Sequence, residues 1–398
     1  MKRPAPIRAF LFRNRRSTMI RTMLSAFLII CTLSNCKDPS VGQGALPPTP
    51  AYVFGWANIA DSSTAVLNTA FWNAGSRYYN TDNRGDTQFQ YWPQAHALDV
   101  LVDAYQRTSD ARYVALMNDW FVGVNRANGN TFLNEYYDDM AWNALAMLRA
   151  YDATKDQKWL DATLRVWDDI KTGWNTSQGG GIAWRKGQRD YKNTPSNGPS
   201  AILAIRLYQR LKRPDDLAWA NRIYDWLKRT LVDEQTGLVY DGINRTGNGQ
   251  IDLNWKFTYC QGVWIGAGLE LYRQTGNAVY LNDALKTANN ALSDPGLTTG
   301  GLMRDEGEGD GGLFKGILVR YLTLLALEPD APQTTRSRYV SYLKFNAETL
   351  WRNGTTRPAL LFGPNWNARV GNRTELKTQL SGAMLMEAMA LLKSRNAL

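Results

Sequence analysis

Apolar residues recur at helical spacing along most of the chain, from about residue 60 to the C-terminus. Positions three or four residues apart lie on one face of a helix, so each such run predicts a helix that buries one side. No segment shows a convincing alternation of apolar and polar residues, which would indicate a strand. Twelve helices are predicted, at about residues 62–79, 93–107, 110–126, 136–153, 156–172, 197–211, 214–231, 258–275, 277–292, 311–327, 333–352 and 375–395.

The predicted helices come in pairs. The first helix of a pair is rich in small apolar residues, and a tight polar turn such as Thr108-Ser109-Asp110 or Thr154-Lys155-Asp156 leads to a second, amphipathic helix. Six such hairpins bury every small-residue helix if they close into an (α/α)6 barrel, with six inner helices surrounded by six outer helices. An open solenoid would use the same hairpins, but its repeats are usually more uniform in length. We therefore predict an all-α fold, with a single (α/α)6 domain over residues 56–398.

The connections that enter the inner helices are long and rich in Gly, Asn and Trp, and the barrel topology places them all at one rim. Long loops at one end of a rigid scaffold indicate a cleft there. Aromatic and amide side chains in such a cleft suit a sugar, which offers a stacking face and hydroxyl groups, and the chain has no P-loop for phosphate. The entering segments include residues 91–96, 137–139, 179–185, 193–198, 257–262 and 310–316.

Two adjacent acids, Asp138 and Asp139, fall in the first turn of one predicted inner helix. A helix N-terminus favours an ionised carboxylate, whereas burial and a neighbouring negative charge favour a protonated one. Two acids in different states are what two-carboxylate catalysis requires. The alternative is that the pair only complements the helix dipole.

The charge of the chain is concentrated at its N-terminus. The net charge is +10, but residues 1–35 hold seven basic residues and no acids, which leaves 39 basic and 36 acidic residues for the rest. A domain so nearly balanced has no general reason to bind nucleic acid.

The same N-terminal segment reads as an export signal. Basic residues precede the apolar run 23–33, which is too short to span a membrane, so residues 1–35 are predicted to be a signal peptide. The run ends in a sequence that resembles a bacterial lipoprotein processing box, with Cys36 as the lipid-bearing residue, although Asn35 departs from the small residue expected there. Residues 36–55 would form a flexible tether. We expect a protein anchored by its lipid to the bacterial outer membrane or cell surface; an ordinary signal peptide, and a periplasmic or secreted protein, is the alternative.

Three further features are predicted to be structural. Cys260 is the one cysteine left for the domain, so no disulfide forms there and a buried thiol is expected. His96 is the single histidine of the chain, and a structural role is favoured over sugar contact. The acidic segment 305–310 does not have the spacing of an EF-hand, so we expect a solvated loop rather than a calcium site. No metal or cofactor is expected.

Several motifs together resemble glycoside hydrolase family 76. They are Tyr136-Tyr137-Asp138-Asp139-Met140-Ala141-Trp142, Gly179-Gly180-Gly181-Ile182-Ala183-Trp184, Asn193-Thr194-Pro195-Ser196-Asn197-Gly198, Thr258-Tyr259-Cys260-Gln261-Gly262 and Phe314-Lys315-Gly316. The resemblance runs from about residue 60 to the C-terminus and implies an (α/α)6 barrel with endo-α-1,6-mannanase activity. It implies a retaining mechanism, with Asp138 as nucleophile and Asp139 as general acid/base. Cys260 departs from the asparagine more usual in its motif.

Retention requires two carboxyl groups about 5 to 5.5 Å apart, which adjacent side chains in one helical turn can achieve. The residues at the inner-helix entries are expected to bind the substrate, namely Trp92, Asn134, Tyr137, Trp184, Asn197, Gln261 and Lys315. We expect a monomer that hydrolyses the backbone of α-1,6-mannan. Two alternatives stay open: a surface lipoprotein that only binds the glycan, which would have no use for the acid pair, and a transglycosylase that uses the same intermediate.

Overall fold

A computed structural model describes residues 52–398, and residues Val53–Leu398 form one compact unit. The predicted signal peptide, Cys36 and the tether up to residue 51 lie outside the described residues.

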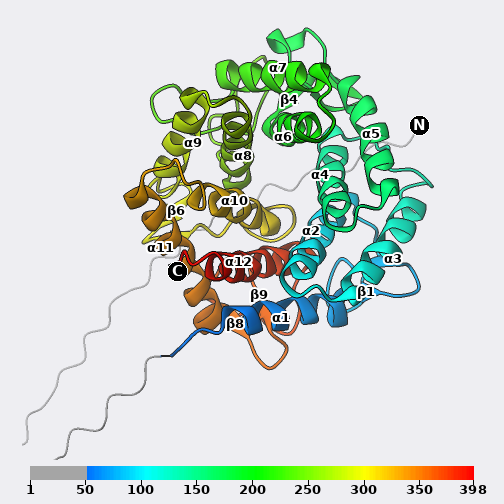
Figure 1. Ribbon diagram of the computed structural model, residues 1–398, viewed down its shortest axis with the longest axis vertical. Helices are drawn as coiled ribbons and strands as arrows, with labels where there is room; N and C mark the ends of the chain where they lie inside the picture. The colour runs from blue at the N-terminus through cyan, green and yellow to red at the C-terminus, as the bar shows by residue number, and fades with distance from the viewer. Residues whose placement is uncertain (1–51) are drawn as a thin grey trace, which may run out of the picture. The chain divides into compact units, whose positions relative to one another are not determined.

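Six helices form a closed inner ring, in which each helix packs against the next and the last packs against the first (Figure 1). They are α2 (Tyr91–Thr108), α4 (Tyr137–Thr154), α6 (Thr194–Leu211), α8 (Thr258–Thr275), α10 (Gly311–Ala326) and α12 (Leu376–Ser394). Six outer helices surround them, and each packs against an inner partner. In the order of those partners they are α3 (Ala111–Ala127), α5 (Gln157–Lys171), α7 (Pro214–Thr230), α9 (Ala278–Ala291), α11 (Gln333–Thr349) and α1 (Trp56–Val66). The predicted (α/α)6 barrel is confirmed.

Small residues let the inner helices approach one another closely. A Cβ atom added to Gly262 on α8 would lie 2.8 Å from Cα of Leu318 on α10, and one added to Gly198 on α6 would lie 2.4 Å from a methyl group of Val263. Large side chains fill the space farther from the axis, where Trp120, Trp159, Trp167, Trp226, Trp264 and Trp366 are fully buried. The small-residue pattern of the inner helices thus follows from the tight ring they form.

The tight turns have one recurring geometry. Ser109, Lys155, Lys212 and Gly276 end inner helices in the left-handed conformation, which terminates a helix. In three of the four cases a side chain at the start of the next helix caps it by accepting a backbone N–H of that helix. The capping residues are Asp110, Asp156 and Asn277. All these turns lie at the end of the barrel opposite to the inner-helix entries.

The prediction for the first helix was wrong. Helix α1 begins at Trp56 and passes into a π-helical segment at Leu67–Phe71, and residues 72–79 form a hairpin instead of the predicted helix. Turn chemistry overrides the apolar periodicity there, since the Asn73 side chain accepts the Ser76 N–H and Arg77 has a positive φ of 60°.

Short strands, which the sequence pattern did not predict, lie in the connections that enter the inner helices. Two-stranded hairpins are formed by β1 (Trp72–Asn73) with β2 (Tyr78–Tyr79), β6 (Thr298–Thr299) with β7 (Leu302–Met303), and β8 (Thr355–Thr356) with β9 (Leu361–Phe362). A three-stranded antiparallel sheet, in the order given, contains β3 (Ala183–Arg185), β4 (Gln188–Asn193) and β5 (Gly242–Ile243), with Lys192 opposite Ile243. A 3-10 turn, Ser177–Gly179, precedes this sheet. Between residues 52 and 398, none of the helices is both long enough and apolar enough to cross a bilayer.

Candidate active site

A cleft of about 830 Å³ opens where the six inner helices begin. Every inner helix contributes a residue from its first turn or two, namely Trp92, Asp138 with Asp139, Pro195, Tyr259, Phe314 and Lys377. The connecting segments add Tyr136, Trp184, Tyr191, Asp241, Arg245, Trp255, Phe257, Glu306 and Asp310. Aromatic residues are thus the most numerous class in the lining and acids come next, which suits a site that stacks on sugar rings.

Asp138 and Asp139 lie in the first turn of α4 and both line the cleft, but their surroundings differ. Oδ1 of Asp138 accepts the backbone N–H of Asp139 at 3.0 Å, and Oδ2 accepts the indole N–H of Trp184 at 3.1 Å. Within residues 52–398 no hydrogen bond reaches the carboxyl group of Asp139. Donors that point at a carboxylate stabilise its ionised form, so the geometry favours charge on Asp138.

Burial raises the pKa of both carboxyl groups. For Asp138 the two kinds of hydrogen bond oppose this effect, while the negative charge of Asp241 adds to it. For Asp139 the charges of Asp138 and then Asp310 add to burial, and its pKa is raised well above the usual value. The pair therefore holds one proton near neutral pH, and Asp139 is the carboxyl group that keeps it.

Two tyrosine rings and one guanidinium group pack against the indole of Trp184. Its ring centroid is 5.2 Å from that of Tyr136 and 5.7 Å from that of Tyr191, and the guanidinium of Arg185 lies 5.0 Å from the indole centroid. Strand β3 carries Trp184 to the start of α4, because Tyr136 forms a β-bridge with Arg185. Trp184 and Trp92 both line the cleft, and their contact with substrate stays a prediction.

Asp241 is a buried acid of the cleft that the sequence did not single out. It accepts hydrogen bonds from the hydroxyl of Tyr191, at 3.0 Å, and from that of Tyr259, and the thiol of Cys260 lies 3.6 Å away. Burial raises the pKa of Asp241, against the effect of these hydrogen bonds. Cys260 is buried as predicted, and its thiol contributes to this network. No helical pattern or motif marks residue 241, since it lies in the irregular connection between α7 and α8.

Three predicted substrate-binding residues do not line the cleft, and their amides bond to neighbouring segments of the chain instead. Asn197 bonds both the N–H and the C=O of Ile182, at 2.8 and 2.9 Å, and Gln261 bonds both groups of Val239, at 2.9 and 2.8 Å. Asn134 accepts the N–H of Tyr136 and donates to the side chain of Asn128. Asn197 and Gln261 are fully buried, so we correct their predicted role from sugar contact to support of the loops.

Tyr137 and Lys315 also point away from the cleft. The Tyr137 hydroxyl pairs with that of Thr172 at 3.2 Å, and the ammonium of Lys315 donates to the carbonyl of Pro364 and lies 4.6 Å from the ring centroid of Trp366. Both side chains are almost fully buried. Their predicted contact with substrate is corrected in the same way.

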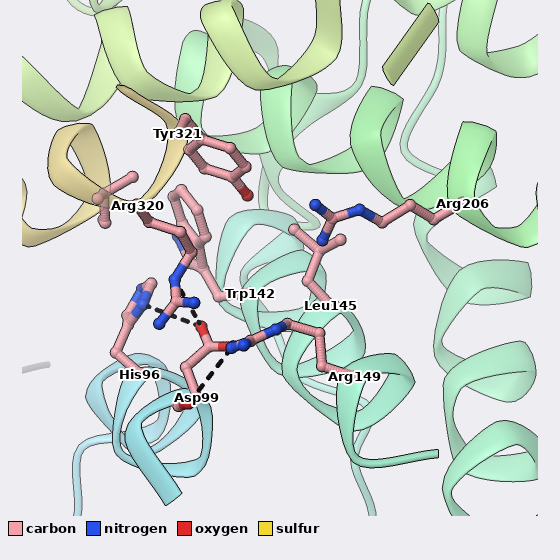
Figure 2. Close-up of a pocket in the computed structure, with 9 residues that line it drawn as sticks. His96, Asp99, Trp142, Leu145, Arg149, Arg206, Arg320 and Tyr321 are labelled. Carbon is pink, nitrogen blue, oxygen red and sulfur yellow. Dashed lines mark hydrogen bonds and ion pairs between the residues drawn. The ribbon is translucent and has the colours of Figure 1, made fainter. Parts of the chain in front are cut away.

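His96 lies beneath the cleft floor, in a small polar layer across the barrel axis (Figure 2). Its ring contacts those of Trp92 and Trp142, at centroid distances of 5.7 and 5.2 Å, and its Nδ1 is 3.6 Å from Asp99. Burial lowers the pKa of His96 despite the opposing effect of Asp99. A neutral, buried imidazole that supports two cleft tryptophans agrees with the predicted structural role.

The layer below the cleft continues as an ion-pair network. Asp99 pairs with Arg149 from α4, and Asp103 pairs with Arg149 and with Arg320 from α10. Figure 2 shows the guanidinium groups of Arg149 and Arg320 converging on Asp99. These pairs tie three inner helices together behind the site.

The acidic segment 305–310 was predicted to be a solvated loop, but two of its acids make hydrogen bonds to other parts of the domain. Glu306 accepts from the backbone N–H and the hydroxyl of Thr258, and Asp310 accepts from Trp92 and Lys377. Among residues 52–398, no group of three or more His, Cys, Asp or Glu side chains is placed to hold a metal ion.

Comparison with known proteins agrees with the geometry. Residues 56–397 match glycosyl hydrolase family 76. The chain is similar to the alpha-1,6-mannanase GH76A of Salegentibacter, with 45% identity, a TM-score of 0.83, and coverage of 85% of this chain and 99% of that one. That structure is an inactive variant with two consecutive aspartates replaced by alanine, in complex with alpha-1,6-mannotetrose. A Listeria innocua protein is 39% identical, with a TM-score of 0.80 over 85% of this chain and 98% of that one.

Fungal proteins are more distant relatives. The mannan endo-1,6-alpha-mannosidase DCW1 of Candida glabrata is 27% identical over 51% of this chain and 51% of its own length. The chain thus spans about half the length of this relative. The match over residues 56–397, the closed double ring of helices and the paired aspartates agree, and the chain belongs to glycosyl hydrolase family 76.

Proposed function

We propose that this protein is a retaining endo-α-1,6-mannanase. The observation that carries the proposal is the unequal environment of two adjacent carboxyl groups in one aromatic cleft: Asp138 accepts two N–H donors, and Asp139 accepts none from residues 52–398. The Salegentibacter relative, named as an alpha-1,6-mannanase, supports the linkage, and its inactive variant lacks two consecutive aspartates.

In the first step, a carboxylate oxygen of Asp138 attacks the anomeric carbon of the bound mannose. The bond from that carbon to the glycosidic oxygen breaks, and Asp139 gives its proton to this oxygen, so the rest of the chain leaves as an alcohol. The product is a covalent ester between the sugar and Asp138.

In the second step, water attacks the same carbon from the side of the departed chain. The carboxylate of Asp139 takes a proton from this water, and the bond to Asp138 breaks and restores its carboxylate. Two inversions give a product of retained configuration, and both acids return to their starting states.

The direct test is incubation with linear α-1,6-mannan and chromatographic analysis of the products. We expect shorter α-1,6-mannooligosaccharides from the wild type and none from Asp138→Asn. Asp168→Asn is a matched control, because Asp168 also belongs to an adjacent aspartate pair but is exposed on outer helix α5, and it should retain full activity.

Two other outcomes would indicate the alternatives. Binding of mannan without cleavage would indicate a glycan-binding protein, and products longer than the substrate would indicate transglycosylation.

We also propose that the protein is an exported lipoprotein that acts as a monomer on α-mannan. The sequence of residues 1–36 supports the lipid anchor.

A further inference from the structure

Residues 306–310 form a strap along the rim of the barrel, between the starts of α8 and α12, the two inner helices that flank α10. At one end, the carboxylate of Glu306 accepts the backbone N–H of Thr258, the first residue of α8, at 2.9 Å. At the other end, the N–H of Gly309 donates to the carboxylate of Glu375, which precedes α12, at 3.0 Å. The strap is therefore fixed to two inner helices, and it carries Asp310 into the cleft.

Asp310 stands at the N-cap position of α10 but does not cap that helix with its side chain. Its Oδ1 instead accepts the indole N–H of Trp92 and the ammonium of Lys377, each at 3.1 Å. A capping hydrogen bond from aspartate usually stabilises a helix by about 1 kcal/mol. The carboxylate is thus used in the cleft rather than at its own helix.

Lys377 departs from the usual preference in the same way. It lies in the first turn of α12, where the helix dipole disfavours a cation, and its side chain is only 8% exposed. Two residues that depart from helix-end preferences therefore meet at one hydrogen-bonded cluster. Such departures are expected where function, rather than stability, selects the residue.

We propose, resting on the mannanase function above, that Asp310 is a positioning residue that orients the Trp92 indole as the stacking surface for the sugar bound beside Asp139. Trp92, Asp310, Lys377 and Asp139 line the same cleft. The indole of Trp92 contacts the rings of His96, at 5.7 Å, and Phe314, at 6.5 Å, and the hydrogen bond to Asp310 is the one that holds its N–H edge.

Asp310 also acts on the proposed general acid. The groups that face Asp139 are Asp138 on its own helix, Tyr91 from α2 and Asp310 from the strap, with Lys377 across the cleft. After burial and Asp138, the charge of Asp310 is a cause of the raised pKa of Asp139. Removal of that charge lowers this pKa, so Asp139 loses its proton at lower pH.

Two variants separate the hydrogen bond from the charge. Asp310→Asn keeps an oxygen that can accept from Trp92, so KM for α-1,6-mannan should stay within about twofold while the alkaline limb of the kcat/KM profile moves to lower pH. Asp310→Ala removes both; because the Asp310 side chain is 67% exposed, the lost hydrogen bond is partly replaced by water, and KM should rise about three- to tenfold. Glu308→Gln is the matched control, an exposed acid of the same strap, and should change neither quantity.

The orientation of the indole is measured without turnover. In protein labelled with ¹⁵N at tryptophan, the Trp92 indole N–H signal, identified by its loss in Trp92→Phe, should shift in Asp310→Ala and stay unchanged in Glu308→Gln. An unshifted signal in Asp310→Ala, or a shifted signal with KM and pH profile unchanged, would overturn the proposal. A wild type that does not cleave α-1,6-mannan would instead refute the mannanase function, and the indole signal would still decide whether Asp310 holds Trp92.

Discussion

The indole Nε1 of Trp184 lies 3.1 Å from Oδ2 of Asp138, and its N–H is one of two donors that hold this carboxylate. The other donor is the backbone N–H of Asp139, so the residue beside the proposed nucleophile in sequence also stabilises its charge. The two acids are thus distinguished by these two donors, one of them a tryptophan from strand β3.

Loss of that indole donor should lower the ionised fraction of Asp138, the proposed nucleophile. Trp184→Phe keeps a ring against Tyr136 but removes the N–H, so Asp138 becomes easier to protonate. A hydrogen bond to a charged group contributes about 1.5 to 3 kcal/mol, so kcat/KM should fall about tenfold to a hundredfold. The acidic limb of the pH profile should move to higher pH. An unchanged limb would show that Trp184 serves only to bind sugar.

The Gln261 clamp should matter for stability rather than for substrate. Gln261→Leu leaves the N–H and C=O of buried Val239 without partners, which should lower the free energy of unfolding by about 2 to 4 kcal/mol. Denaturant melts measure this change, and KM of the folded protein should stay within about twofold. Gln94→Leu, which breaks the same clamp on Tyr79, is expected to behave alike. A stable variant with weak mannan binding would restore the role in sugar contact.

The axial ion pairs should make stability depend on pH. Burial alone would raise the pKa of Asp99, but Arg320 and Arg149 lower it well below its usual range. A carboxylate with a depressed pKa stabilises the fold above its unfolded pKa, about 3.9, and loses this contribution as pH falls toward its folded pKa. Asp99→Asn should therefore cost about 3 kcal/mol at pH 7, because two buried guanidinium groups lose a partner. The difference in the free energy of unfolding between the wild type and Asp99→Asn, measured by denaturant melts, should decrease below about pH 4. A difference that does not depend on pH would contradict the ion-pair account.

The lipid anchor is tested through Cys36. Labelled palmitate should enter the wild type and place it in the membrane fraction, whereas Cys36→Ser should remain unlabelled and unprocessed. Cys31→Ser, about five residues upstream in the apolar run, is the control and should be processed normally. If processing and fractionation of the Cys36 variant are unchanged, the lipid anchor is refuted and residues 1–35 act as an ordinary signal peptide.

The barrel could be predicted from the sequence because each inner helix carries its small-residue pattern over its full length, and the tight turns repeat. The Asp pair could be predicted because it opens such a helix. The nine strands found between residues 52 and 398 could not, since most contain only two residues and show no alternation. Spacing along the chain also cannot tell an amide that faces a cleft from one that faces a strand. Gln261 and Asn197 lie one helical turn in and therefore meet the backbone of the entering loop. Asp241 and Asp310 act through partners that are far away in sequence, at Tyr191 and Trp92.

The central claim is that Asp138 forms the covalent bond and Asp139 moves the proton. Asp139→Ala should be almost inactive on mannan, whose leaving group needs a proton, but should turn over an aryl α-mannoside with a good leaving group. Asp138→Asn should be inactive on both, because no ester can form.

Azide decides between the roles, because this small anion attacks the anomeric carbon without help from a base. We would incubate Asp139→Ala with the aryl mannoside and azide and determine the configuration of the mannosyl azide by NMR. The account predicts faster turnover with added azide and the α-mannosyl azide, formed with retention through the ester on Asp138. A β-mannosyl azide from this variant, or an α-mannosyl azide from Asp138→Ala instead, would contradict it.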